Sequence, residues 1–191
     1  DIIHPDGITG VIYKAGEQVA TLTTDKNGQA SVDGLYLGDY YVKEISPSVG
    51  YLADETEHDL VCNYEGDFVA EVKRDCLSLE QVMKQPFEII KAANNGKTDA
   101  DLLKGAGFTA YLVSSLTVKE DGSYDFGSAK PVVIGENGAT EIFTDEKGYA
   151  RSIAIPYGTY IVRETTTPHN YTPVNDFIVQ ITENHPTTPQ V

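Results

Sequence analysis

The sequence repeats a stretch of 21 residues at a constant spacing of 120 positions. Residues 24–44 read TDKNGQASVDGLYLGDYYVKE, and residues 144–164 read TDEKGYARSIAIPYGTYIVRE, aligned without a gap. A fixed internal offset is the sequence signature of a tandem array. We therefore expect the chain to contain two copies of one structural unit.

The second half of each copy has the period of a β-strand. Tyr160, Val162 and Glu164 share one face of such a strand, because side chains alternate with a period of two. Tyr40, Val42 and Glu44 have the same arrangement in the first copy. The pattern places a carboxylate in line with the apolar face, so it predicts that Glu44 and Glu164 both point toward a core.

Alternation continues through most of the chain and predicts an all-β fold. Turn residues separate the apolar segments, as is typical of antiparallel sheets. At most one helical turn is expected, at residues 78–84. The other predicted strands are residues 10–23 (a strand, a turn and a second strand), 58–64 and 68–74 (a hairpin), 86–92, 108–113, 131–134 and 140–143 (a hairpin) and 176–182, with loops at 94–101 and 119–128.

The length and the repeat offset favour two antiparallel β-sandwich units of immunoglobulin-like size. We place the junction near residue 84, which gives units 1–84 and 85–191. Comparing the copies predicts that both are incomplete, because the strands of 86–92 and 108–113 have no counterpart before residue 10, and the strand of 68–74 has none at the other end. The chain is therefore expected to be part of a longer protein.

The charge balance limits the possible partners. The chain has 29 acidic and 14 basic side chains and a net charge of -15. Nucleic acids and anionic membranes are therefore not expected to bind it. The sequence has no run of 18 apolar residues and no signal peptide, so no direct membrane contact is predicted.

No motif for enzymatic turnover, a metal or a cofactor is found. Cys62 and Cys76 lack metal-ligand spacing, and the predicted hairpin places Cys62 opposite Val69, which argues against a disulfide between the two cysteines. The turn at residues 25–28 has some likeness to a calcium loop, but it lacks the distal glutamate and is better explained as a β-turn. The histidines occur in no recognisable catalytic order. We expect a protein that is not an enzyme and needs no cofactor.

Three motifs together carry a family resemblance. They are an opening strand that ends in lysine (PFEIIK), an alternating strand that ends in glutamate before a loop with proline and tyrosine (YIVRETTTPHNY and YYVKEISPSVGY), and a TDxxGxA turn before that strand. This combination resembles the Cna B-type family, the prealbumin-like or SpaA-like repeats of Gram-positive surface adhesins and pilins. The resemblance covers nearly the whole chain and implies two tandem prealbumin-like β-sandwiches.

The resemblance also implies a self-formed amide crosslink between a lysine on the first strand and an asparagine or aspartate on the last. Lys91 matches the nucleophile, Glu164 and Glu44 match the promoting acid, and Asp75 matches the acceptor of the first unit. The acceptor of the second unit would follow Val191. Burial disfavours charge and so favours the neutral amine and acid that amide formation needs.

Other readings of these residues remain open. Asn184 is a fallback acceptor within the chain, although it lies off the inward face of its predicted strand. A buried lysine and glutamate can also form an ordinary salt bridge.

The resemblance favours a structural stalk, extracellular and associated with the cell wall, whose partners are neighbouring repeats of the same protein. The alternative is an adhesin module that binds a host protein or glycan through residues 119–128 or through exposed tyrosines.

Overall fold

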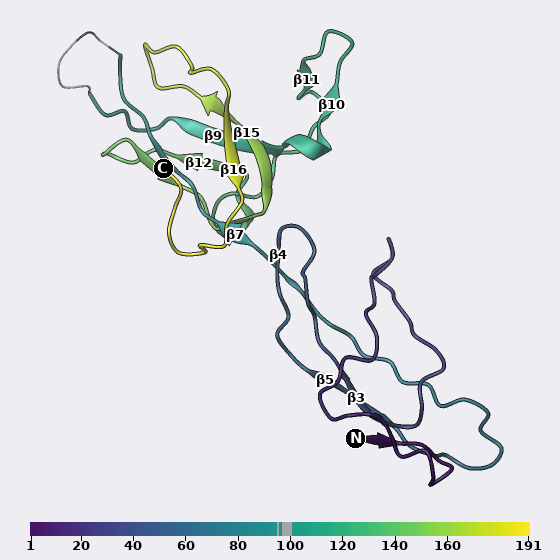
Figure 1. Ribbon diagram of the computed structural model, residues 1–191. Helices are drawn as coiled ribbons and strands as arrows, with labels where there is room; N and C mark the ends of the chain where they lie inside the picture. Colours follow the sequence, from purple (N-terminus) through teal and green to yellow (C-terminus); the bar gives the residue numbers. More distant parts are fainter. Residues whose placement is uncertain (95, 97–100) are drawn as a thin grey trace. The chain divides into compact units, whose positions relative to one another are not determined.

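A computed structural model describes residues 1–94, 96 and 101–191 of the chain (Figure 1). These residues form two compact units. Unit 1 contains residues 1–46 and 54–79, and unit 2 contains residues 47–53 and 80–191. Most of the loop predicted at 94–101 lies outside the described residues.

Unit 1 consists of two antiparallel strand pairs, β1 with β2 and β3 with β5. Its side chains alternate between half-buried and exposed along β3 and β5, as the sequence pattern predicts. Ile2 is the one apolar side chain of this unit that is buried. The strands are β1 (Ile2–Ile3), β2 (Val11–Tyr13), β3 (Gly38–Val42) and β5 (His58–Cys62).

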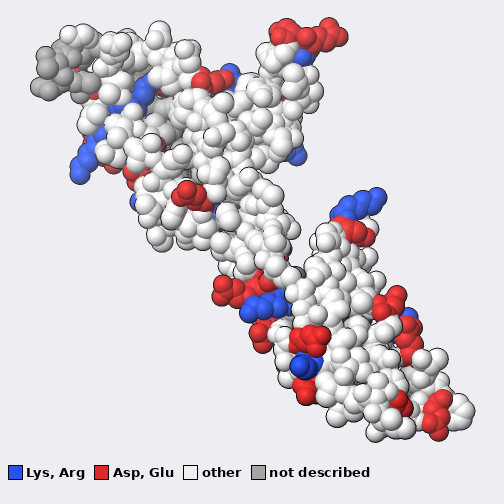
Figure 2. Space-filling view, viewed as in Figure 1, with Lys and Arg blue, Asp and Glu red and all other residues white. Residues whose placement is uncertain are grey.

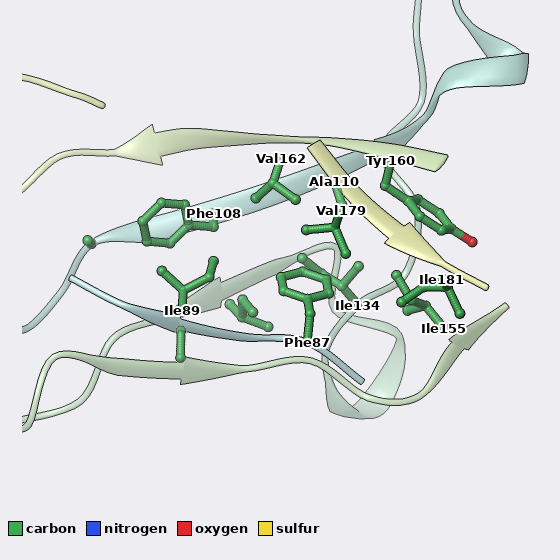
Figure 3. Packing of buried hydrophobic residues seen from close by; sticks show 13 residues of the cluster. Phe87, Ile89, Phe108, Ala110, Ile134, Ile155, Tyr160, Val162, Val179 and Ile181 are labelled. Atoms are coloured by element: carbon green, nitrogen blue, oxygen red, sulfur yellow. The ribbon is translucent and has the colours of Figure 1, made fainter. Parts of the chain in front are cut away.

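Unit 2 is built on a four-stranded antiparallel sheet in the order β12-β9-β15-β16. The pair β8 and β13 lies across the core from this sheet, and Figure 3 shows Phe87 and Ile89 facing Phe108 and Val162. The strands are β4 (Tyr51–Leu52), β6 (Gln81–Val82), β7 (Lys84–Gln85), β8 (Glu88–Ile90), β9 (Gly107–Leu112), β10 (Thr117–Val118), β11 (Tyr124–Asp125), β12 (Glu141–Phe143), β13 (Tyr149–Arg151), β14 (Ile155–Pro156), β15 (Gly158–Thr166) and β16 (Phe177–Ile181).

The prediction of an all-β fold is confirmed. Helix in the described part of the chain is limited to two 3-10 turns, η1 (Val113–Ser115) and η2 (Glu136–Gly138). The strand pairings between named strands are all antiparallel.

The two copies of the repeat form the same local contacts. The hydroxyl of Tyr160 donates to the carbonyl of Pro156 at 2.7 Å, and the hydroxyl of Tyr40 donates to that of Tyr36 at 2.6 Å. The turns match as well, since the carboxylates of Asp25 and Asp145 each accept the backbone N–H groups two and four residues later. The 120-residue offset is therefore a structural repeat.

Three predicted elements are wrong. Residues 68–74 form no strand, because no described strand lies beside them to take their backbone hydrogen bonds. Of residues 10–23, only Val11–Tyr13 is a strand. The helical turn expected at residues 78–84 is instead β6 and β7, since Gln81–Val82 pairs with Tyr51–Leu52.

The segment 119–128, predicted as a surface loop, includes part of a small hairpin formed by β10 and β11. Of the predicted hairpin 131–134 with 140–143, the second arm forms β12 and pairs with β9.

Acidic side chains are spread over the visible surfaces of both units and do not gather in one patch (Figure 2). In the described part of the chain, no helix has the length and apolar character needed to cross a membrane.

Candidate functional site: a buried lysine and glutamate

The site lies in unit 2, where Lys91 follows β8 and Glu164 lies near the end of β15. Lys91 is fixed by its backbone, because its N–H donates to the carbonyl of Gly148 at 2.8 Å and its carbonyl accepts the N–H of Leu103 at 2.9 Å. The alternation that places Phe87 and Ile89 inward also turns the Lys91 side chain inward. Along β15, Tyr160 and Val162 point inward, and the same alternation turns the Glu164 side chain inward.

The two side chains meet inside the unit. Lys91 Nζ lies 2.8 Å from Glu164 Oε2, and the side chains are 7% and 0% exposed. Glu164 pairs across the sheet with Phe108, which is itself buried and packs edge-on against Phe177. The ion pair therefore lies in an apolar environment, where an unpaired charge is costly.

The two carboxylate oxygens of Glu164 differ in the partners that the described residues give them. Oε2 accepts hydrogen bonds from Lys91 and from the backbone N–H of Val174, both at 2.8 Å. Oε1 is buried, and no described group donates to it. An unsatisfied buried polar atom costs about 1–3 kcal/mol, and more when it is charged. Such an atom in a folded domain calls for a physical explanation.

A single parallel bridge lies at the start of β8, near this site. Gln190 forms a parallel bridge to Phe87, with its N–H donating to the carbonyl of Pro86 at 2.9 Å and its carbonyl accepting the N–H of Glu88 at 2.8 Å. Backbone groups alternate along a strand, so the N–H and C=O of Ile90 point to the same edge as those of Glu88.

The register of this bridge can be extended. Lys91 is four residues after Phe87, so the residue opposite Lys91 on a continuing parallel strand would be the fourth after Gln190. Paired residues of parallel strands project to the same face. A side chain at that position would point at Lys91 and Glu164.

Unit 1 contains the matching glutamate in the matching position. Glu44 accepts the backbone N–H of Asp54, ten residues later, just as Glu164 accepts that of Val174. Asp54 also accepts hydrogen bonds from Ser78 at 2.7 Å and from the ring of His58 at 2.8 Å. Hydrogen bonds from the side chains of Thr56, Ser78 and His58, in decreasing order of effect, hold the pKa of the Asp54 carboxyl well below its usual range.

The other two predicted residues are Asp75, the expected acceptor of the first unit, and Asn184, the fallback acceptor of the second. Asp75 is exposed and lies outside the strands. The side-chain carbonyl of Asn184 accepts the N–H of Lys84 at 3.1 Å. Lys84 is seven residues before Lys91 on an extended segment, which corresponds to roughly 20 Å.

Sequence reasoning missed two groups that order the site. The first is the backbone N–H of Val174. It follows Glu164 by ten residues, as Asp54 follows Glu44, and this common spacing could have indicated it. The second is Thr144, whose buried hydroxyl accepts the N–H of Ala106 at 2.9 Å and donates to the carbonyl of Leu103 at 2.7 Å. Thr144 thus orders the turn whose Leu103 N–H holds the Lys91 carbonyl.

No group of three or more metal-binding side chains occurs within residues 1–94, 96 and 101–191. The cysteines in this part of the chain are both free thiols.

The chain is thus built of tandem β units, and unit 2 holds a buried lysine and glutamate between its sheets. The sequence profile of the SpaA prealbumin-like fold domain matches residues 6–75 and 86–191. The chain belongs to this family.

One solved structure supports the fold: the Bacillus anthracis TIE protein is similar at 27% identity and a TM-score of 0.55, over 85% of this chain and 26% of that one. A streptococcal ancillary pilin is 18% identical with a TM-score of 0.36, over 86% of this chain and 46% of that one. The shaft pilin spaA of Lactobacillus rhamnosus GG is 19% identical with a TM-score of 0.36, over 86% of this chain and 64% of that one.

This chain thus spans about a quarter of the length of the TIE protein. No curated protein matches the sequence.

Proposed function

We propose that this chain is a spacer segment of a bacterial surface protein, adhesin-like or pilin-like, in which each complete domain is locked by a self-formed amide. Membership of the SpaA family supports a surface role of this kind. The proposal places the protein outside the cell, attached to the cell wall, with neighbouring repeats of the same protein as its partners. It requires neither turnover of a substrate nor a cofactor.

The observation that carries the crosslink is the buried Oε1 of Glu164, to which no described group donates, beside a strand edge that pairs with no described residue beyond Gln190. An acceptor side chain at the fourth position after Gln190 would lie next to Lys91 Nζ, and its carbonyl oxygen would take a hydrogen bond from Glu164 once that acid is protonated. In unit 1 the proposal assigns Glu44 as the promoter and Asp75 as the acceptor, with a lysine supplied by a preceding strand; Asp75 would have to leave its exposed position and join a last strand beside that lysine.

The reaction is balanced without a further reagent. A proton moves from Lys91 Nζ to Glu164 along their 2.8 Å hydrogen bond, which leaves a neutral amine and a neutral acid. The amine nitrogen attacks the side-chain carbonyl carbon of an asparagine or of a protonated aspartate, and one proton of that nitrogen is relayed through Glu164 to the leaving group. Ammonia leaves from asparagine, or water from aspartate, as the new amide forms. Fixed geometry supplies the rate advantage, because groups held in contact react as if very concentrated.

A bond between the first and last strands would suit a spacer. It closes a loop of about one domain, for which chain-entropy estimates reach roughly 4–5 kcal/mol. It would also carry tension along the chain without loading the hydrogen bonds between strands.

The test is intact-mass measurement of a chain that continues past Val191 by one strand of its parent protein. We expect a mass one ammonia or one water below the sequence mass, and the full sequence mass for Lys91→Ala and Glu164→Ala. Full mass in the extended wild-type chain would refute the crosslink in this domain. Asn184 remains a fallback only if the deficit is already present in the 191-residue chain.

The alternative of a host-binding module would use residues 119–128 or exposed tyrosines, and the structure bears on the first of these. There one face of the Phe126 ring is taken by the chain itself, with the Arg163 guanidinium 4.0 Å from its centre, and Tyr111 packs edge-on at 5.2 Å. An aromatic ring used for stacking a ligand would need a free face. This arrangement favours the spacer.

A further inference from the structure

The strand β16 is an edge strand of the four-stranded sheet of unit 2. It pairs with β15 on one side, and no described residue pairs with its other side. Its sequence, FIVQI, has no charge and no proline, and Ile178 is 65% exposed. An edge of this kind is a template for pairing with another strand.

The corresponding edge in unit 1 is blocked. Gly38 and Gly158 are equivalent in the repeat, and they pair with Cys62 and Ile181. The residue before each partner, Val61 in unit 1 and Gln180 in unit 2, is therefore also equivalent. Arg74 donates from Nε to the carbonyl of Val61 at 2.8 Å, so a long charged side chain occupies that edge. The same bond shows that the carbonyl of Val61 points outward. By the matching register, the backbone groups of Ile178 and Gln180 point outward in unit 2, where no described side chain covers them.

We propose that β16 pairs with β16 of a second copy of this chain, antiparallel, about a two-fold axis at Ile178. In this register Ile178 lies opposite its symmetry mate, and Asp176 lies opposite Gln180 of the other copy. The interface is then self-complementary: an apolar pair at the centre, and on each side a carboxylate that accepts from an amide. A two-fold interface requires such a match, since the same patch is used by both copies.

The outer face of the sheet supports this register. Ile161 pairs with Ile178 across β15 and β16, and Arg163 forms an ion pair with Asp176 at 3.0 Å. A hollow of about 370 Å³ opens beside them, lined by Tyr124, Phe126, Ile161 and Ile178 among others. The second Ile178 would extend this apolar row and partly fill the hollow. Strand pairing supplies affinity and such a hollow supplies selectivity for the side chain.

The net charge of -15 opposes association of two copies. Repulsion between like-charged proteins is screened by salt, whereas strand pairing and apolar contact are not. We therefore expect the dimer to become stronger as salt is raised.

The test is sedimentation velocity of the 191-residue chain from about 10 to 500 µM, at about 0.15 M and 0.5 M salt. We expect a dimer that grows with protein concentration and with salt. Ile178→Lys places two ammonium groups opposite each other and should weaken the dimer about tenfold or more. Its matched control, Val61→Lys, makes the same type of change on the blocked edge of unit 1 and should leave the dimer unchanged.

Cysteine crosslinking tests the register, in a Cys62→Ser, Cys76→Ser background. The Cα atoms of Ile178 and its mate would be about 5.5 Å apart, within disulfide range. Those of Gln180 and its mate would be about 14 Å apart. Ile178→Cys should therefore form a disulfide dimer under mild oxidation and Gln180→Cys should not.

Three results would overturn the proposal: a monomer at every concentration and salt, a dimer insensitive to Ile178→Lys, or equal crosslinking of the two cysteine variants. Each is independent of the amide at Lys91, because Ile178 is on the outer face of the sheet.

Discussion

Replacing Lys91 by methionine isolates the energetic role of the buried pair. The change keeps most of the apolar stem of the side chain and removes the ammonium group. It leaves Glu164, whose side chain is 0% exposed, with the Val174 N–H as its remaining described donor. Removing one partner of a buried ion pair costs about 3–5 kcal/mol, because the other charge stays uncompensated. We expect unit 2 of the Lys91→Met variant to lose that amount of its free energy of unfolding.

The assay must report on unit 2 alone, since a chain of two units need not unfold in one step. Urea titration followed through the backbone amide signals of β9 and β15 satisfies this requirement. Lys104→Met is the matched control, because Lys104 pairs with Glu146 where both side chains are exposed, at 65% and 77%. Exposed pairs contribute about 0–1 kcal/mol. Equal losses in the two variants, or a loss below about 1 kcal/mol for Lys91→Met, would refute the view that the pair is buried and coupled.

Three further predictions concern the repeat. Gly148 and Gly28 both have a left-handed backbone, but a Cβ on Gly148 would lie 2.6 Å from the Lys91 carbonyl and one on Gly28 would meet nothing within 4 Å. Urea unfolding should therefore show Gly148→Ala to cost about 2 kcal/mol more than Gly28→Ala, and equal costs would contradict the packing. Tyr160→Phe removes the hydrogen bond to the carbonyl of Pro156 and should cost unit 2 about 1 kcal/mol; no measurable loss would contradict a contribution from this bond. Hydrogen bonds from the backbone N–H groups of Tyr149 and, less strongly, Lys147 lower the pKa of the Asp145 carboxyl below its ordinary value of 3.8. The carboxylate therefore stabilises the fold above pH 3.8, and this stabilisation is lost as the pH falls through the folded-state pKa. An NMR titration that gives Asp145 a pKa at or above 3.8 would contradict this.

The parts of the fold that could be predicted are those set by local pattern. The period-two face of Tyr160, Val162 and Glu164 indicated the inward carboxylate, and the same rule applied to Phe87 and Ile89 placed Lys91 inside. Neither inference needs knowledge of a partner strand, because alternation is a property of the extended backbone itself. The turns at Asp25 and Asp145 were equally local.

Elements that depend on distant partners were not predictable in this way. Residues 68–74 alternate as well as β16 does, yet they form no strand, since pairing decides whether an extended segment becomes part of a sheet. Residues 78–84 look helical over one turn, but Tyr51–Leu52 supplies a strand partner from 30 positions earlier in the sequence. The bridge from Gln190 to Phe87, which sets the register at the site, spans more than 100 residues and has no local signal.

Peptide mapping can locate the proposed bond between Lys91 and its acceptor. A complete second domain, extended past Val191, would be digested with trypsin and the peptides identified by tandem mass spectrometry. We expect one branched peptide, uncleaved after Lys91, in which Lys91 Nζ is joined to the asparagine or aspartate four residues after Gln190. Recovery of Lys91 only as the C-terminal residue of an ordinary linear peptide would contradict it.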